Sequence, residues 1–112
     1  MKIVNIKEQP IHETVHKVAV RKLYDYETAQ AMHITLEPGE SLKPHITATD
    51  VFFYILEGAI DVRVGDETIT VQQDHLVESP KDIVHCLSNS SEKRGCILVV
   101  KAPRPTKQAR LL

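Results

Sequence analysis

Short stretches rich in Val, Ile, Thr and Phe alternate along the chain with turn-forming residues, and no stretch carries the apolar repeat of an amphipathic helix. Turn signals occur at Pro38-Gly39, Glu57-Gly58, Gly65-Asp66, Pro80-Lys81 and 89–91. Between them lie β-rich segments near residues 30–36, 51–56, 59–64, 67–72, 75–78, 83–87 and 96–101. Several short strands at this spacing are typical of a sandwich or a small barrel. The pattern therefore predicts an all-β protein.

The clearest local element is a hairpin over residues 62–71. Apolar and polar residues alternate on both sides of Gly65-Asp66, which is a favoured two-residue turn. Residues 28–32 also fit a short helical turn, but Pro38 and Gly39 would stop any longer helix.

The 112 residues suffice for one domain. We divide it into an extended N-terminal arm at 1–25, a barrel at 31–101 and a basic tail at 102–112. With Lys101, the tail brings four cations and no acidic residue, together with two prolines. Such a segment is usually a solvated end. The alternative is that it lies over a partner subunit or an anionic ligand.

Composition narrows the class of protein. The net charge of −1 gives no basic surface for nucleic acid. The longest apolar run, Val51 to Leu56, is too short to span a membrane, and residues 1–9 lack a signal-peptide core. We expect a cytoplasmic protein with no nucleic-acid or membrane partner. Cys86 and Cys96 are interpreted as reduced small hydrophobes, with cross-strand pairing as the alternative.

Two segments resemble the paired motifs of the cupin superfamily. In the first, Gly39 is followed after five residues by His45-Ile46-Thr47, and a strand then runs from Asp50 to Gly58. The second has Asp74, then Pro80-Lys81-Asp82, His85 and Asn89, with aspartates at the two glycine positions of the family. If the position of Asp82 requires positive φ, Asp tolerates it better than most residues.

The resemblance implies a double-stranded β-helix, the jelly-roll or cupin barrel of two antiparallel sheets around a central pocket. In metal-binding cupins the ligands are two histidines and a glutamate from the first motif and one histidine from the second. This chain keeps His45 and His85. Thr47 stands at the second histidine position, and Val51 stands at the glutamate position.

Asp50 lies one residue from the expected carboxylate. Side chains alternate along a strand, so an inward His45 predicts an outward Asp50. A one-residue bulge at 47–49 would reverse the phase and bring both Asp50 and Tyr54 inward. The candidate metal ligands are then His45, Asp50 and His85, for Fe, Mn, Ni or Zn. Thr47 and Tyr54 are candidate ligand-pocket residues.

Three functions remain open for a small molecule bound in the barrel. A metal-dependent enzyme would oxygenate, decarboxylate or isomerise its substrate. A metal-free enzyme, such as an isomerase, would use His45 as base, with His85 or Tyr54 as its partner. A binding or sensor protein would use the two histidines only for hydrogen bonds. Whether the chain is an enzyme is left undecided by the sequence.

The remaining histidines are expected on the surface. His12 and His16 have a helical metal-binding spacing, but the valines around them favour an extended arm. His33 and His75 are expected on outward or turn positions. Residues 51–56 and 97–100 are apolar on both faces, which predicts burial on both sides and a homodimer that covers an outer sheet face.

Overall fold

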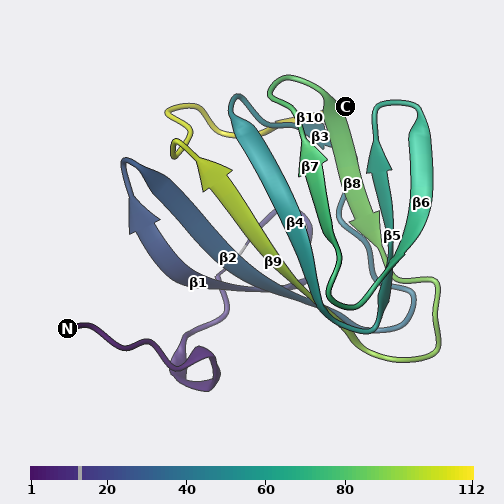
Figure 1. Ribbon diagram of the computed structural model, residues 1–112, viewed down its shortest axis with the longest axis horizontal. Helices are drawn as coiled ribbons and strands as arrows, with labels where there is room; N and C mark the ends of the chain where they lie inside the picture. Colours follow the sequence, from purple (N-terminus) through teal and green to yellow (C-terminus); the bar gives the residue numbers. More distant parts are fainter. Residues whose placement is uncertain (13) are drawn as a thin grey trace.

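The computed structural model describes residues 1–12 and 14–112 and consists almost wholly of β-strands (Figure 1). A 3-10 turn, η1 (Ile6–Glu8), precedes ten strands. Among the described residues, no helix is long and apolar enough to cross a membrane. The strands are β1 (Ala19–Tyr26), β2 (Ala29–Leu36), β3 (His45–Ile46), β4 (Asp50–Glu57), β5 (Ala59–Val64), β6 (Glu67–Gln72), β7 (Leu76–Ser79), β8 (Val84–Ser88), β9 (Gly95–Ala102) and β10 (Arg110–Leu111).

The strands form two antiparallel sheets, as predicted, and each sheet has five strands. The first sheet has the order β1-β2-β9-β4-β7, and the second has the order β10-β3-β8-β5-β6. All seven predicted strand segments are present, with ends that differ by one residue or less. The hairpin over 62–71 is the β5–β6 pair, in which Val64 faces Glu67.

Three strands were not predicted. Residues 28–32 are not helical, because β2 pairs with β1 on one side and with β9 on the other. The first sheet therefore begins at Ala19, inside the segment assigned to the arm. The two-residue strands β3 and β10 pair with each other at the edge of the second sheet. The end of the basic tail is thus paired with the barrel, and Arg104 contacts Asp25 at 3.1 Å.

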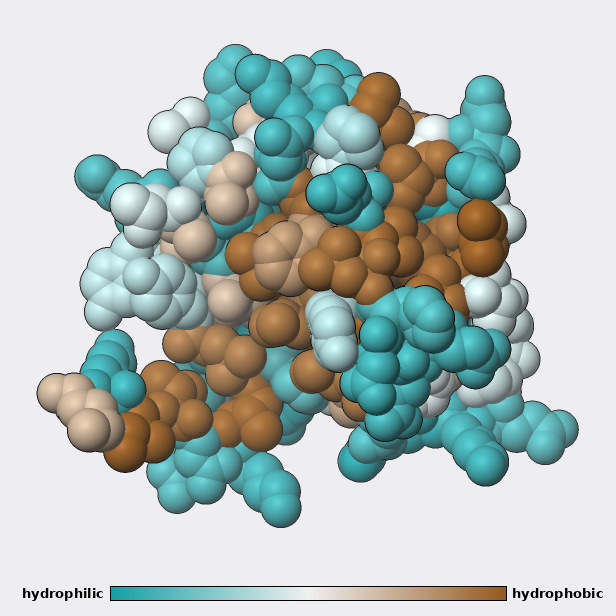
Figure 2. Space-filling view, in the orientation of Figure 1, coloured by the Kyte–Doolittle hydropathy of each residue, from teal (hydrophilic) through white to brown (hydrophobic). Residues whose placement is uncertain are grey.

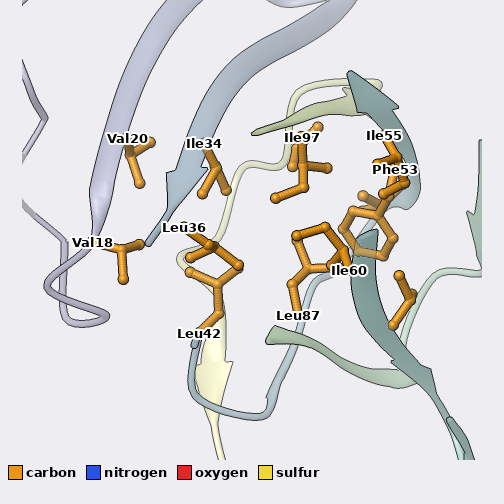
Figure 3. Close-up of a cluster of buried hydrophobic side chains, with 13 residues drawn as sticks. Val18, Val20, Ile34, Leu36, Leu42, Phe53, Ile55, Ile60, Leu87 and Ile97 are labelled. Atoms are coloured by element: carbon orange, nitrogen blue, oxygen red, sulfur yellow. The ribbon is translucent and has the colours of Figure 1, made fainter. Parts of the chain in front are cut away.

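The core lies between the two sheets. Buried residues at alternate positions of the strands point inward from both sides (Figure 3). Ile97 and Ile55 of the first sheet meet Ile60 and Leu87 of the second sheet, and each of these four side chains is fully buried.

Cys86 and Cys96 are both free. Cys86 lies on β8 of the second sheet, whereas Cys96 lies on β9 of the first. The connection after Ser88 crosses from one sheet to the other, so the symmetric spacing about Ser91 does not make a hairpin. The cross-strand pairing considered from the sequence is therefore absent.

The backbone conformation at two turns explains why aspartate can stand where the family has glycine. Asp74 and Asp82 have φ of 66° and 64°, the left-handed conformation that Asp tolerates better than most residues. Gly58, at the β4–β5 turn, has φ of 79°. A Cβ atom at Gly58 would lie 2.7 Å from the carbonyl oxygen of Arg94. This turn therefore requires glycine for both conformation and space.

We predict that Gly58→Ala lowers the free energy of unfolding by roughly 2 kcal/mol or more, through left-handed strain and the backbone clash. Gly39→Ala is the matched control, because Gly39 has φ of 86° but nothing within 4 Å of an added Cβ. It should cost about 1 kcal/mol. Urea denaturation measures both values, and equal losses would contradict the role of the Arg94 carbonyl.

Candidate functional site

The side chains from His45 to Ile55 alternate without interruption between the barrel interior and its outside. His45, Thr47, Thr49, Val51, Phe53 and Ile55 are all buried. Asp50 is exposed, and Tyr54 is half-buried on the outer face. The irregularity in β4 lies between Ile55 and Glu57, beyond this segment.

The structure does not bring Asp50 together with His45 and His85. The Asp50 carboxylate instead accepts a hydrogen bond from the backbone N–H of Lys81 at 2.9 Å. Tyr54 also lies outside the pocket, and its hydroxyl donates to Asp74 at 3.3 Å. The bulge that would turn both residues inward is not formed, since residues 47–49 bend between β3 and β4 with Thr47, Thr49 and Val51 on the buried side.

The interior site is built from one row of residues in each sheet. In the first sheet, Val51 of β4 is paired with Lys101 of β9 and with Ser79 of β7. In the second sheet, His45 of β3 is paired with His85 of β8. Directly paired residues present their side chains on the same face of a sheet. The topology thus places a lysine, a serine and two histidines on the inward faces of the two sheets.

His85 connects the two rows. Its exposed fraction is 2%. Its Nδ1 lies 2.7 Å from the hydroxyl of Ser79, and its Nε2 lies 3.1 Å from the hydroxyl of Thr47. A neutral imidazole has one donor and one acceptor, and the two hydroxyls can supply the complementary pair. Both ring nitrogens of His85 are therefore used inside the protein.

The backbone of Lys43 orients two further imidazoles in opposite ways. His45 donates from Nδ1 to the Lys43 carbonyl oxygen at 2.7 Å, so its Nε2 carries a lone pair. His16 accepts at Nδ1 from the Lys43 N–H at 2.9 Å, so its Nε2 carries the proton. The ring centroids lie 4.8 Å apart. Nε2 of His45 is therefore a free acceptor and Nε2 of His16 is a free donor, and both rings line the same cavity.

The cavity has a volume of about 90 Å³. Its polar lining consists of Thr14, His16, His45, His85 and Lys101. The remainder is apolar, with Val20, Met32, Ile34, Leu42, Val51, Phe53 and Val99. No described residue that lines it is acidic.

Two lining residues were misassigned from the sequence. His16 was expected on the surface, but the arm folds back and places its ring beside His45. Lys101 was counted with the solvated tail. Alternation along the strand does not mark Lys101 as inward, because residues 97–100 are apolar on both faces. For His16 no local signal exists, since its neighbour His45 lies 29 positions later in the chain.

The cavity disfavours positive charge on its histidines. Burial lowers the pKa of His85 to about 3, helped by the charges of His45, Lys101 and His16. Burial, His45, Lys43 and Lys101 lower the pKa of His16 to about 4. The pKa of His45 is also lowered, mainly by burial. Burial lowers the pKa of Lys101 too. The three rings are therefore neutral imidazoles at neutral pH.

These residues do not fit the divalent metal that the family resemblance implies. Catalytic metal sites usually need three protein ligands. His85 has both nitrogens engaged, and the lone pair of His16 accepts the Lys43 N–H, which leaves only Nε2 of His45. Across residues 1–12 and 14–112, no group of three His, Cys, Asp or Glu side chains has the geometry to hold a metal.

The other histidines lie away from the cavity. His12 and His75 are exposed, as expected. His33 is half-buried on β2, and its Nδ1 has no hydrogen-bond partner among the described residues.

Comparison with known proteins agrees with this architecture. A search of curated proteins gives no match. The crystal structure of TT1209 from Thermus thermophilus is 30% identical, with a TM-score of 0.81 over 94% of this chain and 100% of that chain. The polyketide cyclase RemF from Streptomyces resistomycificus is 20% identical, with a TM-score of 0.86 over 100% of this chain and 85% of that chain. KdgF from Halomonas sp. is 15% identical, with a TM-score of 0.83 over 95% of this chain and 96% of that chain.

The last two likenesses concern the fold alone. The family itself is identified by the Cupin domain profile, which matches residues 32–101. This match contains both motif segments, the strands β4 to β8 and nearly all of β2 and β9. The chain belongs to the cupin family.

Proposed function

We propose that this protein binds a small organic anion inside its barrel without a metal ion, and that Lys101 supplies the positive charge. The observation that carries the proposal is the position of Lys101, which shares a cavity with three neutral imidazoles and with no described acidic side chain. In metal-dependent cupins a cation in the barrel attracts an anionic or carbonyl ligand. Here the ammonium group takes that electrostatic role.

Three contributions support an anionic ligand. A lysine in an apolar surround is stabilised in its charged form by an opposite charge. Lys101 lowers the pKa of each of the three histidines, so its charge acts on the whole polar side of the cavity. His16 presents a neutral N–H donor, which suits a carboxylate oxygen.

The size of the cavity limits the ligand. With a volume of about 90 Å³, the cavity is large enough for several water molecules. Many drug-sized ligands occupy several hundred Å³. The proposed ligands are therefore carboxylates of two to four carbons, with the carboxylate at Lys101 and the carbon chain against the apolar lining.

We also propose that the protein is a homodimer. Phe52, Leu98 and Val100 point away from the core on adjacent strands β4 and β9, and Leu76 of β7 is 50% exposed. Figure 2 shows hydrophobic side chains gathered across the middle of this face, where Figure 1 draws β9 and β4. Contiguous apolar patches of this kind commonly mark an interaction surface.

Metal-free protein should bind lactate, as detected by calorimetry after dialysis against chelator and elemental analysis. Lys101→Met should weaken binding about 10- to 100-fold, because a hydrogen bond to a charged group is worth about 1.5–3 kcal/mol. Lys107→Met, an exposed tail substitution, is the control and should bind as wild type. Binding that disappears with the metal and returns with iron, manganese, nickel or zinc would contradict the proposal.

The lowered histidine pKa values predict that the protein loses stability in mild acid. In the unfolded chain a histidine takes up a proton near pH 6.5, whereas His85 and His16 in the fold do so only near 3 and 4. Between these limits the unfolded state binds more protons, so the free energy of unfolding falls as the pH is lowered from 6.5. Urea denaturation at a series of pH values measures the slope.

His85→Gln should flatten that slope by up to about 1.4 kcal/mol per pH unit, since one titrating group is removed. His75→Gln, on the surface, is the control and should keep the wild-type slope. A wild-type stability that is unchanged between pH 7 and pH 5 would show that the interior histidines are not held neutral.

Sedimentation velocity at micromolar concentration should give a dimer. Phe52→Glu should shift the protein to a monomer, because it places a charge in the centre of the apolar face. Ile69→Glu is the control, since Ile69 is exposed on β6 of the other sheet and should leave the dimer intact. A compact wild-type monomer would refute the dimer.

A further inference from the structure

Lys101 lines the same cavity as a proton acceptor, His45, and a hydrogen-bond donor, His16. The two interactions of Lys43 leave the Nε2 lone pair of His45 and the Nε2 proton of His16 for the cavity that Lys101 also lines. A group that only held a carboxylate would need donors alone. The acceptor at His45 has no role in binding an anion, which points to proton transfer.

Lys101 is placed as a nucleophile. Its side chain follows Ile97 and Val99 on the inward face of β9, and it lies opposite Val51, so its methylene groups run along apolar surface. No ion pair to Lys101 is formed by the described residues. Burial lowers its pKa. Lysines in such surroundings can supply a neutral amine for reaction with carbonyl compounds.

We infer that Lys101 condenses with the carbonyl group of a small 2-oxo acid to form an imine, with His45 as the proton carrier and His16 as the donor to the carbonyl oxygen. The inference rests on the proposed function, because the same cavity must first accept the carboxylate. A three-carbon acid such as pyruvate matches the volume of about 90 Å³.

The step balances without any oxidant or reductant. His45 Nε2 takes one proton from the Lys101 ammonium group, and the freed amine forms a bond to the carbonyl carbon while the C=O electron pair moves onto oxygen. The His16 N–H stabilises that oxygen by a hydrogen bond. A second proton passes from nitrogen to oxygen, and His45 returns its proton to the hydroxyl group. Water leaves, and a protonated C=N bond to Lys101 remains.

Because His16 is neutral, it suits the role of hydrogen-bond donor to the carbonyl oxygen. A neutral imidazole that donates a hydrogen bond polarises a carbonyl group without giving up its proton. His85 is not assigned a role in the reaction, because its two nitrogens are bonded to Ser79 and Thr47. Its contribution is to hold the wall of the cavity against which His45 packs, with ring centroids 4.5 Å apart.

The test is reductive trapping with the full chain. Protein is incubated with pyruvate and cyanoborohydride, and the adduct is followed by intact mass and located by peptide mapping. We expect one adduct per chain at Lys101, formed at least 10-fold faster than at the exposed Lys107 or Lys81. His45→Gln should slow trapping at least 10-fold while lactate still binds, because general acid–base catalysis typically contributes 10²–10⁴-fold.

Lys101→Arg tests the need for the amine, since arginine keeps the charge but forms no imine under these conditions. It should give no site-specific adduct. Lys101→Met lacks both the amine and the charge, so it should give no site-specific adduct and should bind lactate only weakly. Wild-type protein that binds lactate and pyruvate but gives adducts only at the rate of surface lysines would overturn the inference and leave the anion site standing. Wild-type protein that binds neither acid would overturn both.

Discussion

The two-residue alternation of side chains through β3 and β4 decides which chemical groups this barrel has available. Residues 47–49 bend between β3 of the second sheet and β4 of the first, and across this bend every second side chain from His45 to Ile55 stays buried. The carboxylate of Asp50 belongs to the other, outward set, so the interior receives imidazole and hydroxyl groups in its place. The hydroxyl partner of His85 Nε2 and the lack of an acidic side chain in the described cavity lining both follow from this phase.

Hydrogen bonds on both sides of the chain stabilise this inward and outward alternation, and they would be lost if the alternation shifted by one residue. Asp50 accepts the Lys81 N–H, and the N–H of Asp82 donates to the carbonyl oxygen of Thr47 at 3.0 Å. On the inside, the Thr47 hydroxyl is one of the two partners of His85. A one-residue slip would leave Nε2 of the buried His85 without its partner and place a carboxylate among apolar side chains, and both changes cost free energy. The outer turn and the inner hydrogen bonds therefore stabilise the same register.

His85 has a structural role that differs from that of a metal ligand. It joins β8 of the second sheet to β7 of the first through Ser79, and it packs edge-on against Phe53 with ring centroids 5.3 Å apart. A buried ring with both nitrogens bonded stiffens the wall of the cavity. The groups left free for chemistry are His45, His16 and Lys101, of which only His45 belongs to the motif positions that carry metal in the family. The fold is retained here while the site on it has changed.

The sequence by itself determined the all-β class, seven of the ten strands, the cupin family and the interior positions of His45, Thr47 and His85. These features depend on local alternation, on turn residues such as Gly58, and on spacing within two short motifs, all of which act over a few neighbouring residues. The tertiary structure alone decided the direction of Asp50, because residues 51–56 are apolar on both faces and the hydrophobic pattern fits either phase. The tertiary structure alone also brought His16 and Lys101 to the cavity that His45 lines. That arrangement depends on the return of the arm over the barrel and on the pairing of β9 with β4, and contacts between segments so far apart in the chain leave no periodic signal in the sequence.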